Sequence, residues 1–309
     1  MVRNRAIDIL RFLGPLLITN SHMDLIYPNS FYATGGALGD AIFFFISGFT
    51  LNFTKYTTVF EWFKRRLYRI YLVVFSVALF HEVLSLNDRT IVDTILNGGG
   101  WFVKCLLIYY IVFLLVRERS IKFLLGLIIT IYFVSVIYMF FAEENFSIYG
   151  GTYFKWLHFL VPFLLGVLNF RVFHLLKFRR NSWAIAMVLF IGYYGLLYLS
   201  GLNVQFWFIT SALSIVVLSA LVNILFVCAL GSENIFSTRF VKLIIMTVGS
   251  IALEIYLVQD PLIKYNFTEN QYFNVGIVWV VIFTCAYLVK VIANILASNR
   301  LSWDIFKVY

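Results

Sequence analysis

The chain has 309 residues, of which 62% are hydrophobic and only 13% are charged, and its formal net charge at pH 7 is +9. Soluble domains are about half apolar and about one quarter charged, so this composition excludes an ordinary soluble enzyme and indicates a polytopic membrane protein. No soluble domain is present to gather the basic residues on one face, which argues against nucleic acid as a partner.

Apolar segments long enough for an α-helix to cross a bilayer recur along the sequence. Ten are expected, at residues 6–25, 37–54, 68–86, 100–117, 121–142, 154–171, 182–200, 204–229, 243–263 and 275–297. The sequence therefore predicts an all-α fold, a polytopic integral membrane bundle of about ten transmembrane helices. We expect residues 1–309 to form a single transmembrane domain.

The distribution of lysine and arginine predicts how this bundle is oriented. Eighteen of the 24 basic residues fall in one set of connections between the predicted helices. The alternate set holds only Arg89, Lys155 and Lys264, and three more, Arg11, Lys104 and Lys290, lie within predicted helices. Because cytoplasmic loops are enriched in basic residues, both termini are expected in the cytoplasm. The basic loops are also expected to contact anionic membrane lipids.

The first predicted helix carries a cation and an imidazole. Arg11 and His22 are eleven residues apart, which returns the second side chain to within roughly 20° of the first, about 16 Å along the axis. Charged groups at membrane depth usually face a protein interior or a watery cavity, so the pair is a functional candidate. Two structural alternatives stay open, in which Asp8 neutralises Arg11 and His22 is an interfacial residue beside Asp24.

The same residues argue against a cleaved signal peptide at the N-terminus. Asp8, Arg11 and His22 interrupt the apolar run, and no small-residue cleavage site follows it, so we expect the segment to be retained. The three cysteines are far apart within predicted helices, which supports neither a disulfide framework nor a metal site. No phosphate-binding GxxxxGK[ST] loop is present, which argues against a nucleotide-hydrolysing pump.

Further motifs follow the Arg-x10-His pair in a recognisable order. They are GDAIFFFISGF at 39–49, KRRLYRI at 64–70, WFVKCLLIYY at 101–110 and LEIYLVQ at 253–259. In this order and over essentially the whole chain, the motifs resemble those of the membrane-bound acyltransferase 3 family.

The resemblance implies an O-acyltransferase, usually an O-acetyltransferase, of the bacterial inner membrane. Such a protein moves the acyl group of cytoplasmic acyl-coenzyme A to a hydroxyl of a cell-envelope or exported polysaccharide, or of a lipid-linked sugar. It needs no permanently bound cofactor and no metal, because acetyl-CoA is a substrate. By resemblance, His22 is the catalytic histidine, Arg11 its partner, and Arg66 and Arg69 the R-x2-R arginines.

Two departures from the family pattern limit this transfer of roles. The family often has GVD before the phenylalanines, whereas here the acid is one position earlier, at Asp40, and Ala41 takes its place. The family often has a histidine after the late IYL segment, whereas here that position is Gln259. A role for a second histidine is therefore not carried over.

The chemistry suits these residues. A sugar hydroxyl is a weak nucleophile near neutral pH, so its attack on a thioester gains from a positioned base such as imidazole. Charge on the carbonyl oxygen needs hydrogen-bond donors, for which Ser47, Asn20, Ser21 or a backbone amide near Gly48 are candidates. The phosphates of coenzyme A are expected to pair with the guanidinium groups of Arg11, Arg65, Arg66 and Arg69.

Several of these assignments have structural alternatives. Arg66 and Arg69 also suit ordinary anchors at the inner membrane surface, and Ser47-Gly48 also suits close packing of two helices. Glu254 lies in a predicted membrane helix, so we expect it to pair with an arginine or a histidine, either as structure or as support for the site. His158 is a further candidate for a residue that lines the cavity, and His81-Glu82 reads as an interfacial pair.

The competing class of function is transport. Buried charges along one stripe also suit a transporter or flippase of a lipid-linked sugar or small solute. Transporters often contain internal repeats, and the 11–49 pattern has no convincing repeat in the second half. Covalent transfer of an acyl group separates the two classes.

Overall fold

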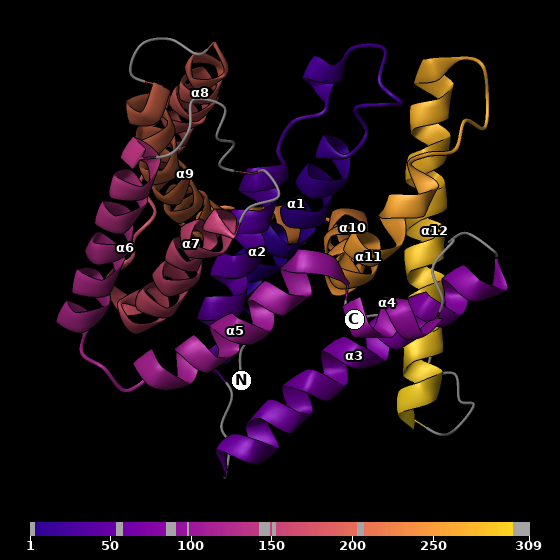
Figure 1. Cartoon of the computed structure of the whole chain (residues 1–309), viewed down its shortest axis with the longest axis horizontal. Coiled ribbons are helices and arrows are strands. Elements are labelled where there is room, and N and C mark those ends of the chain that lie inside the picture. The colour runs from indigo at the N-terminus through magenta and orange to yellow at the C-terminus, as the bar shows by residue number, and fades with distance from the viewer. Residues whose placement is uncertain are drawn as a thin grey trace. The chain divides into compact units, whose positions relative to one another are not determined.

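Helices make up nearly all of the protein (Figure 1). This computed structural model describes residues 4–53, 58–84, 91–97, 99–141, 149, 153–202 and 207–298, and none of these residues is in a β-strand. The prediction of an all-α fold is therefore confirmed. The chain forms two compact units. The first consists of Met1–Leu10, Asp40–Lys55 and Tyr109–Ser237, and the second of Arg11–Gly39, Tyr56–Ile108 and Thr238–Tyr309.

A helix occupies each of the ten predicted segments. In chain order these helices are α1 (Arg5–Ser21), α2 (Gly36–Leu51), α3 (Val59–Val83), α5 (Gly100–Val116), α6 (Ile121–Phe141), α7 (Phe154–Arg171), α8 (Ser182–Gly201), α9 (Trp207–Leu230), the pair α10 (Arg239–Ser250) and α11 (Ala252–Leu262), and α12 (Gln271–Ser298). A short α4 (Ile91–Asn97) and three 3₁₀ turns, η1 (Ser30–Tyr32), η2 (Phe173–Leu175) and η3 (Glu233–Ser237), lie between them.

Several of these helices are long and apolar enough to cross a membrane, so the protein is a multi-pass membrane protein. Among the described residues, five meet both criteria, and the bent pair α10–α11 raises the number to six. Ten crossings and cytoplasmic termini stay predictions. Of the basic residues that predict the orientation, Arg3, Lys55, Arg89, Arg300 and Lys307 lie outside the described residues.

The predicted single helix at 243–263 is wrong in one respect. The chain breaks between Ser250 and Ala252, where α10 and α11 meet at a bend of 70°. Sharp bends in helices occur at glycine and serine pairs, and Gly249 and Ser250 stand directly before this one. The segment is thus a broken span or a re-entrant turn.

The outward faces of α6 and α8 are apolar. Phe133 of α6 is 66% exposed and Val188 of α8 is 69% exposed, and further large apolar side chains on both helices are also exposed. In water such extended apolar surface is unfavourable, whereas hydrocarbon tails solvate it. These faces therefore suit contact with lipid.

Aromatic side chains fill the core of the first unit. Phe45 and Phe226 are fully buried with ring centroids 5.3 Å apart, and Phe49 lies 5.1 Å from Phe226. Close packing of α2 against α7 places Gly48 beside the backbone of Phe163 and Gly166 beside the backbone of Phe45. A β-carbon added at either glycine would lie 2.0 Å from a carbonyl oxygen. Gly48 thus has the packing role that the sequence left open.

We expect Gly48→Ala and Gly166→Ala each to lower the free energy of unfolding by about 1–3 kcal/mol, because the new methyl group forces two helix backbones apart. Denaturation in detergent micelles measures this change. Gly126→Ala in α6 is the matched control, since nothing lies within 4 Å of its added β-carbon. Alanine there favours the helix by up to about 1 kcal/mol. A Gly48→Ala protein as stable as Gly126→Ala would contradict the tight crossing.

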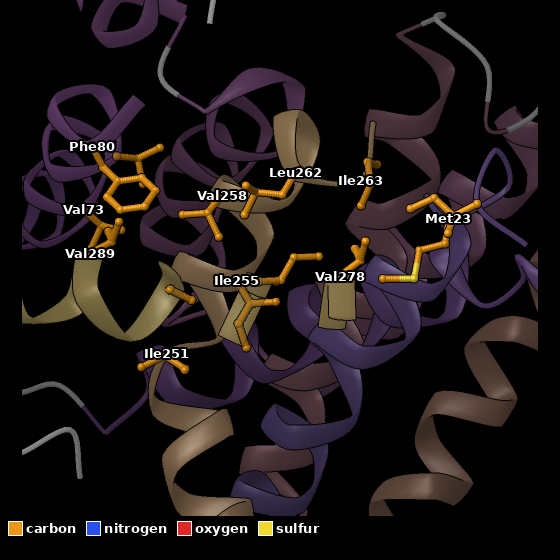
Figure 2. Packing of buried hydrophobic residues seen from close by; sticks show 14 residues of the cluster. Met23, Val73, Phe80, Ile251, Ile255, Val258, Leu262, Ile263, Val278 and Val289 are labelled. Atoms are coloured by element: carbon orange, nitrogen blue, oxygen red, sulfur yellow. The ribbon is translucent and has the colours of Figure 1, made fainter. Parts of the chain in front are cut away.

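Apolar side chains from four parts of the second unit form its core (Figure 2). Val73 and Phe80 come from α3, Ile255 from α11, Val278 from α12 and Met23 from the turn after α1. Met23, Ile255 and Val278 are fully buried. This core fixes the turn that carries His22 against α11 and α12.

Candidate active site

His22 is the first residue after α1, and its side chain is exposed. The helix ends at Ser21, earlier than the predicted boundary at 25, and the His22 amide donates to the carbonyl of Thr19 at 3.1 Å. Helical spacing from Arg11 therefore holds only as far as Ser21, so it does not place His22 on the Arg11 stripe, and the turn after α1 sets the direction of His22. An exposed imidazole at a helix end is accessible to a substrate.

Three glycines let the start of α2 pack closely against the end of α1. A β-carbon at Gly36 would lie 2.4 Å from Ser21 Oγ, and one at Gly39 would lie 2.7 Å from the carbonyl oxygen of Gly14. Gly35 has a φ of +105°, a left-handed conformation that favours glycine. The close packing of α2 against α1 therefore requires glycine at these three positions.

Asn20 ties the end of α1 to the loop that follows it. Its Nδ2 donates to the carbonyl oxygens of Tyr32 at 2.7 Å and Thr34 at 2.9 Å, and its Oδ1 accepts from the Tyr27 hydroxyl at 2.6 Å. Burial raises the pKa of the Tyr27 phenol, which keeps it protonated as this hydrogen bond requires. Both amide hydrogens of Asn20 are thus already donated.

A second hydrogen bond joins α1 to α11. Thr19 Oγ1 donates to Gln259 Oε1 at 2.6 Å, and both side chains are buried. Gln259 occupies the position at which the family that the sequence resembles often has a histidine. Its partner Thr19 precedes His22 by three residues. The neighbours of His22 on both sides are therefore anchored, Thr19 by this bond and Met23 by the apolar core.

Two of the predicted oxyanion donors are already used. Asn20 donates as described, and Ser21 Oγ donates to the carbonyl oxygen of Ile18 at 2.7 Å. Ser47 lies inside α2 in the first unit, and no described side-chain hydrogen bond occupies it. The donor set of the site is thus not completed by the end of α1.

The basic residues of the prediction lie on two helices of the second unit. Arg11 is half-buried on α1, three residues after the buried Asp8. On α3, Arg65 and Arg69 are exposed, while the half-buried Arg66 lies over the Trp62 ring at 5.8 Å. A separate open groove of about 490 Å³ along α3 is lined by apolar and aromatic side chains, among them Phe63 and Tyr71, and by Lys64, but by none of these arginines.

The sequence predicted that Glu254 pairs with an arginine or a histidine. Its partner is a lysine instead. Lys290 Nζ lies 2.9 Å from Glu254 Oε1, joining α11 to α12. The Glu254 side chain is 2% exposed and that of Lys290 is 25% exposed. Lys290 is one of the three basic residues that the sequence places inside membrane helices, so the pair neutralises two costly charges.

Asp40 begins the part of α2 that belongs to the first unit. Its Oδ1 is buried and has no hydrogen-bond partner among the described residues, and the charge of Lys155 acts on it. In the same unit, the hydroxyl groups of Tyr149 and Tyr193 share a hydrogen bond of 3.0 Å. The ring centroid of His158 lies 5.6 Å from that of Tyr149. Asp40 is thus part of a buried polar cluster of the first unit.

Two further histidines, His158 and His81, are buried. His158 is 0% exposed and His81 is 5% exposed. Neither ring nitrogen of either residue has a hydrogen-bond partner in the part of the chain that the structure describes. α3 turns His81 into the protein two residues before the helix ends at Val83, and its position at the membrane interface stays a prediction.

One of three comparisons with known proteins finds a match. A family model described as an acyltransferase domain, acyltransferase 3, matches residues 4–298, nearly the whole chain. No curated protein and no solved structure matches the chain significantly.

Proposed function

The chain belongs to the acyltransferase 3 family, and on that premise we propose that it is a membrane O-acyltransferase, with acetyl the expected acyl group. Its donor is cytoplasmic acyl-coenzyme A, and its acceptor is a hydroxyl of a cell-envelope or exported polysaccharide, or of a lipid-linked sugar. The bacterial inner membrane is its proposed location. The family match over residues 4–298 is the observation that carries this proposal.

His22 is the general base in this proposal. The imidazole takes the proton of the acceptor hydroxyl as its oxygen attacks the thioester carbonyl carbon. The C–S bond then breaks, and the proton passes from His22 to the thiolate of coenzyme A. The exposed side chain between two anchored neighbours supports this role, because a base must be both accessible and held in place.

The arginines bind the donor. Arg11, Arg65, Arg66 and Arg69 belong to the predicted cytoplasmic side, where coenzyme A approaches, and guanidinium groups bind phosphates through paired hydrogen bonds. The exposed side chains of Arg65 and Arg69 support this assignment. No bound cofactor or metal is needed, since the thioester supplies the activation.

Removing two of these arginines tests the donor site. We expect Arg11→Ala combined with Arg69→Ala to raise KM for acetyl-coenzyme A about tenfold or more, as loss of charged hydrogen bonds predicts. Arg180→Ala is the matched control, because Arg180 is also exposed on a predicted inner loop. Coenzyme A binding that is equal in the double variant and in the wild type would refute the donor assignment.

The proposed function itself is tested by transfer of label. Membranes that contain the protein are incubated with labelled acetyl-coenzyme A and envelope glycans of the native host, and base-labile label in the glycan is measured. We expect label that depends on the protein. Folded protein that leaves the glycan unlabelled would favour transport or another donor.

One observation favours the transport alternative. The 70° break between α10 and α11 resembles the discontinuous helices of transporters, in which free helix ends bind the solute. A carrier would move a lipid-linked sugar without changing it covalently. The labelled product therefore separates the two functions.

A further inference from the structure

A cavity of about 450 Å³ adjoins the segment that follows His22. Its wall includes Leu25 and Ile26, three and four residues after His22, and the connection between α11 and α12. We call it the α11–α12 pocket, and its polar rim consists of Asn266, Thr268, Glu269, Gln271 and Asn274, with Phe267 beside them. Its volume lies in the range of about 300–1,000 Å³ that is typical of sites for small molecules.

Hydrogen bonds within the connection give this pocket a fixed frame. The buried Asn274 accepts from the Phe267 amide at 2.7 Å and donates to Asn266 Oδ1 at 3.2 Å. Asn270 caps α12 by accepting from the amides of Tyr272 at 3.1 Å and Phe273 at 3.3 Å. The connection therefore holds its shape without a ligand.

Two polar groups remain available on this frame. The side chains of Glu269 and Gln271 are exposed, and no hydrogen bond joins either of them to another described residue. A carboxylate accepts hydrogen bonds, and an amide both donates and accepts them. Together they suit a ligand that carries several hydroxyl groups.

An aromatic surface lies beside these groups. Phe267 is 45% exposed, and its ring centroid is 6.2 Å from that of Tyr265, which is 46% exposed. The apolar face of a sugar ring packs on an aromatic ring, while its hydroxyls bond to neighbouring polar groups. An exposed phenylalanine beside a carboxylate and an amide is this combination.

The charge of the α11–α12 pocket argues against acyl-coenzyme A as its ligand. None of the described residues that line it is basic, and Glu269 is acidic, so the phosphates of coenzyme A would be repelled. The donor is assigned to the arginines of α1 and α3. A neutral polyhydroxyl ligand fits what remains.

We propose that the α11–α12 pocket binds the sugar ring of the acceptor and presents its hydroxyl to His22, with Glu269 and Gln271 bonding to hydroxyls and Phe267 packing on the ring. This inference rests on the proposed function, because it names the acceptor site of the same reaction. The predicted outer position of both Lys264 and His22 agrees with an acceptor outside the cytoplasm.

Binding and transfer are tested on the full-length protein in detergent micelles. The probes are methyl glycosides of common hexoses and N-acetylhexosamines, and binding is followed by saturation-transfer NMR. The variants are Glu269→Gln and Phe267→Ala. Tyr272→Ala is the matched control, because Tyr272 is an exposed aromatic residue at the start of α12 that does not line the pocket.

We expect at least one glycoside to bind the wild type saturably and both pocket variants about tenfold or more weakly, as loss of a charged hydrogen bond or of an aromatic contact predicts. The Tyr272→Ala protein should bind as the wild type does. In transfer assays, the acceptor KM should rise in the pocket variants while KM for acetyl-coenzyme A stays unchanged. Equal binding by all the proteins, or no glycoside bound by the wild type, would overturn the proposal.

The two proposals fail in different ways. Transfer of label that is unaffected by Glu269→Gln and Phe267→Ala would keep the acyltransferase and remove the pocket. Saturable glycoside binding that needs these residues, without any transfer of label, would keep the pocket as a sugar site and remove the acyltransferase. His22→Ala should lower the rate of transfer by about 10²- to 10⁴-fold but leave glycoside binding intact, since His22 does not line the pocket.

Discussion

Replacing His22 by alanine is expected to lower the rate of acyl transfer by about 10²- to 10⁴-fold, the range that general base catalysis supplies. Without the imidazole, the acceptor hydroxyl must attack the thioester while it still holds its proton. The measurement is base-labile label in the glycan per unit of protein, at matched expression. The effect should fall on kcat, because the base acts in the transition state and the substrates bind elsewhere.

Because His22 is exposed, its replacement should change the rate of transfer without changing the stability of the fold. An exposed side chain contributes little to packing, so the thermal stability of the His22→Ala protein should match that of the wild type. His174→Ala is the matched control, because His174 is the other exposed histidine among the described residues and lies in η2. Equal transfer by the His22→Ala and His174→Ala proteins would remove His22 as the base.

Breaking the ion pair between Glu254 and Lys290 is expected to lower the free energy of unfolding by about 3–5 kcal/mol, the cost of leaving one buried charge without its partner. Glu254→Ala should lie near 3 kcal/mol, because Lys290 is 25% exposed and retains some solvation. Lys290→Ala should cost at least as much, since it leaves the almost fully buried carboxylate of Glu254 alone. Denaturation curves in detergent micelles measure both values.

A double variant shows whether the two residues act as a pair. Glu254→Leu combined with Lys290→Met removes both charges and should recover most of the lost stability. The matched control is the exposed ion pair of Arg117 and Glu118, in which Glu118 is 81% exposed, so Glu118→Ala should change stability by less than about 1 kcal/mol. A double variant as unstable as the two single losses combined would contradict a coupled pair.

The sequence predicted the helices well because apolar length is a local property of the chain. It did not predict the break in the ninth segment, since residues 243–263 are apolar on both sides of the bend. The signal was present in Gly249 and Ser250, which precede the bend, but hydropathy averages over such a pair. The end of α1 was placed four residues too late for a similar reason.

The sequence named candidate residues for the site, but it did not give the contacts of the residues around them. Motif order singled out His22 and the arginines, because those positions depend on sequence alone. The partners of Thr19 and Glu254 are Gln259 and Lys290, which are 240 and 36 residues away along the chain. Sequence spacing does not give the register of helices that meet in space. The polar run at 266–274 was overlooked because it lies outside the predicted helices, in the connection before α12 and in the first turn of that helix.

The bend between α10 and α11 decides whether the number of membrane crossings is odd or even. If the pair crosses the bilayer, the predicted crossings are ten in number and both ends of the chain face the same compartment. If the pair turns back, one crossing is lost, α12 runs in the opposite direction, and the two ends face opposite compartments. A reporter of compartment fused after residue 298 distinguishes an odd from an even number of crossings. The same result identifies the compartment that the α11–α12 connection faces.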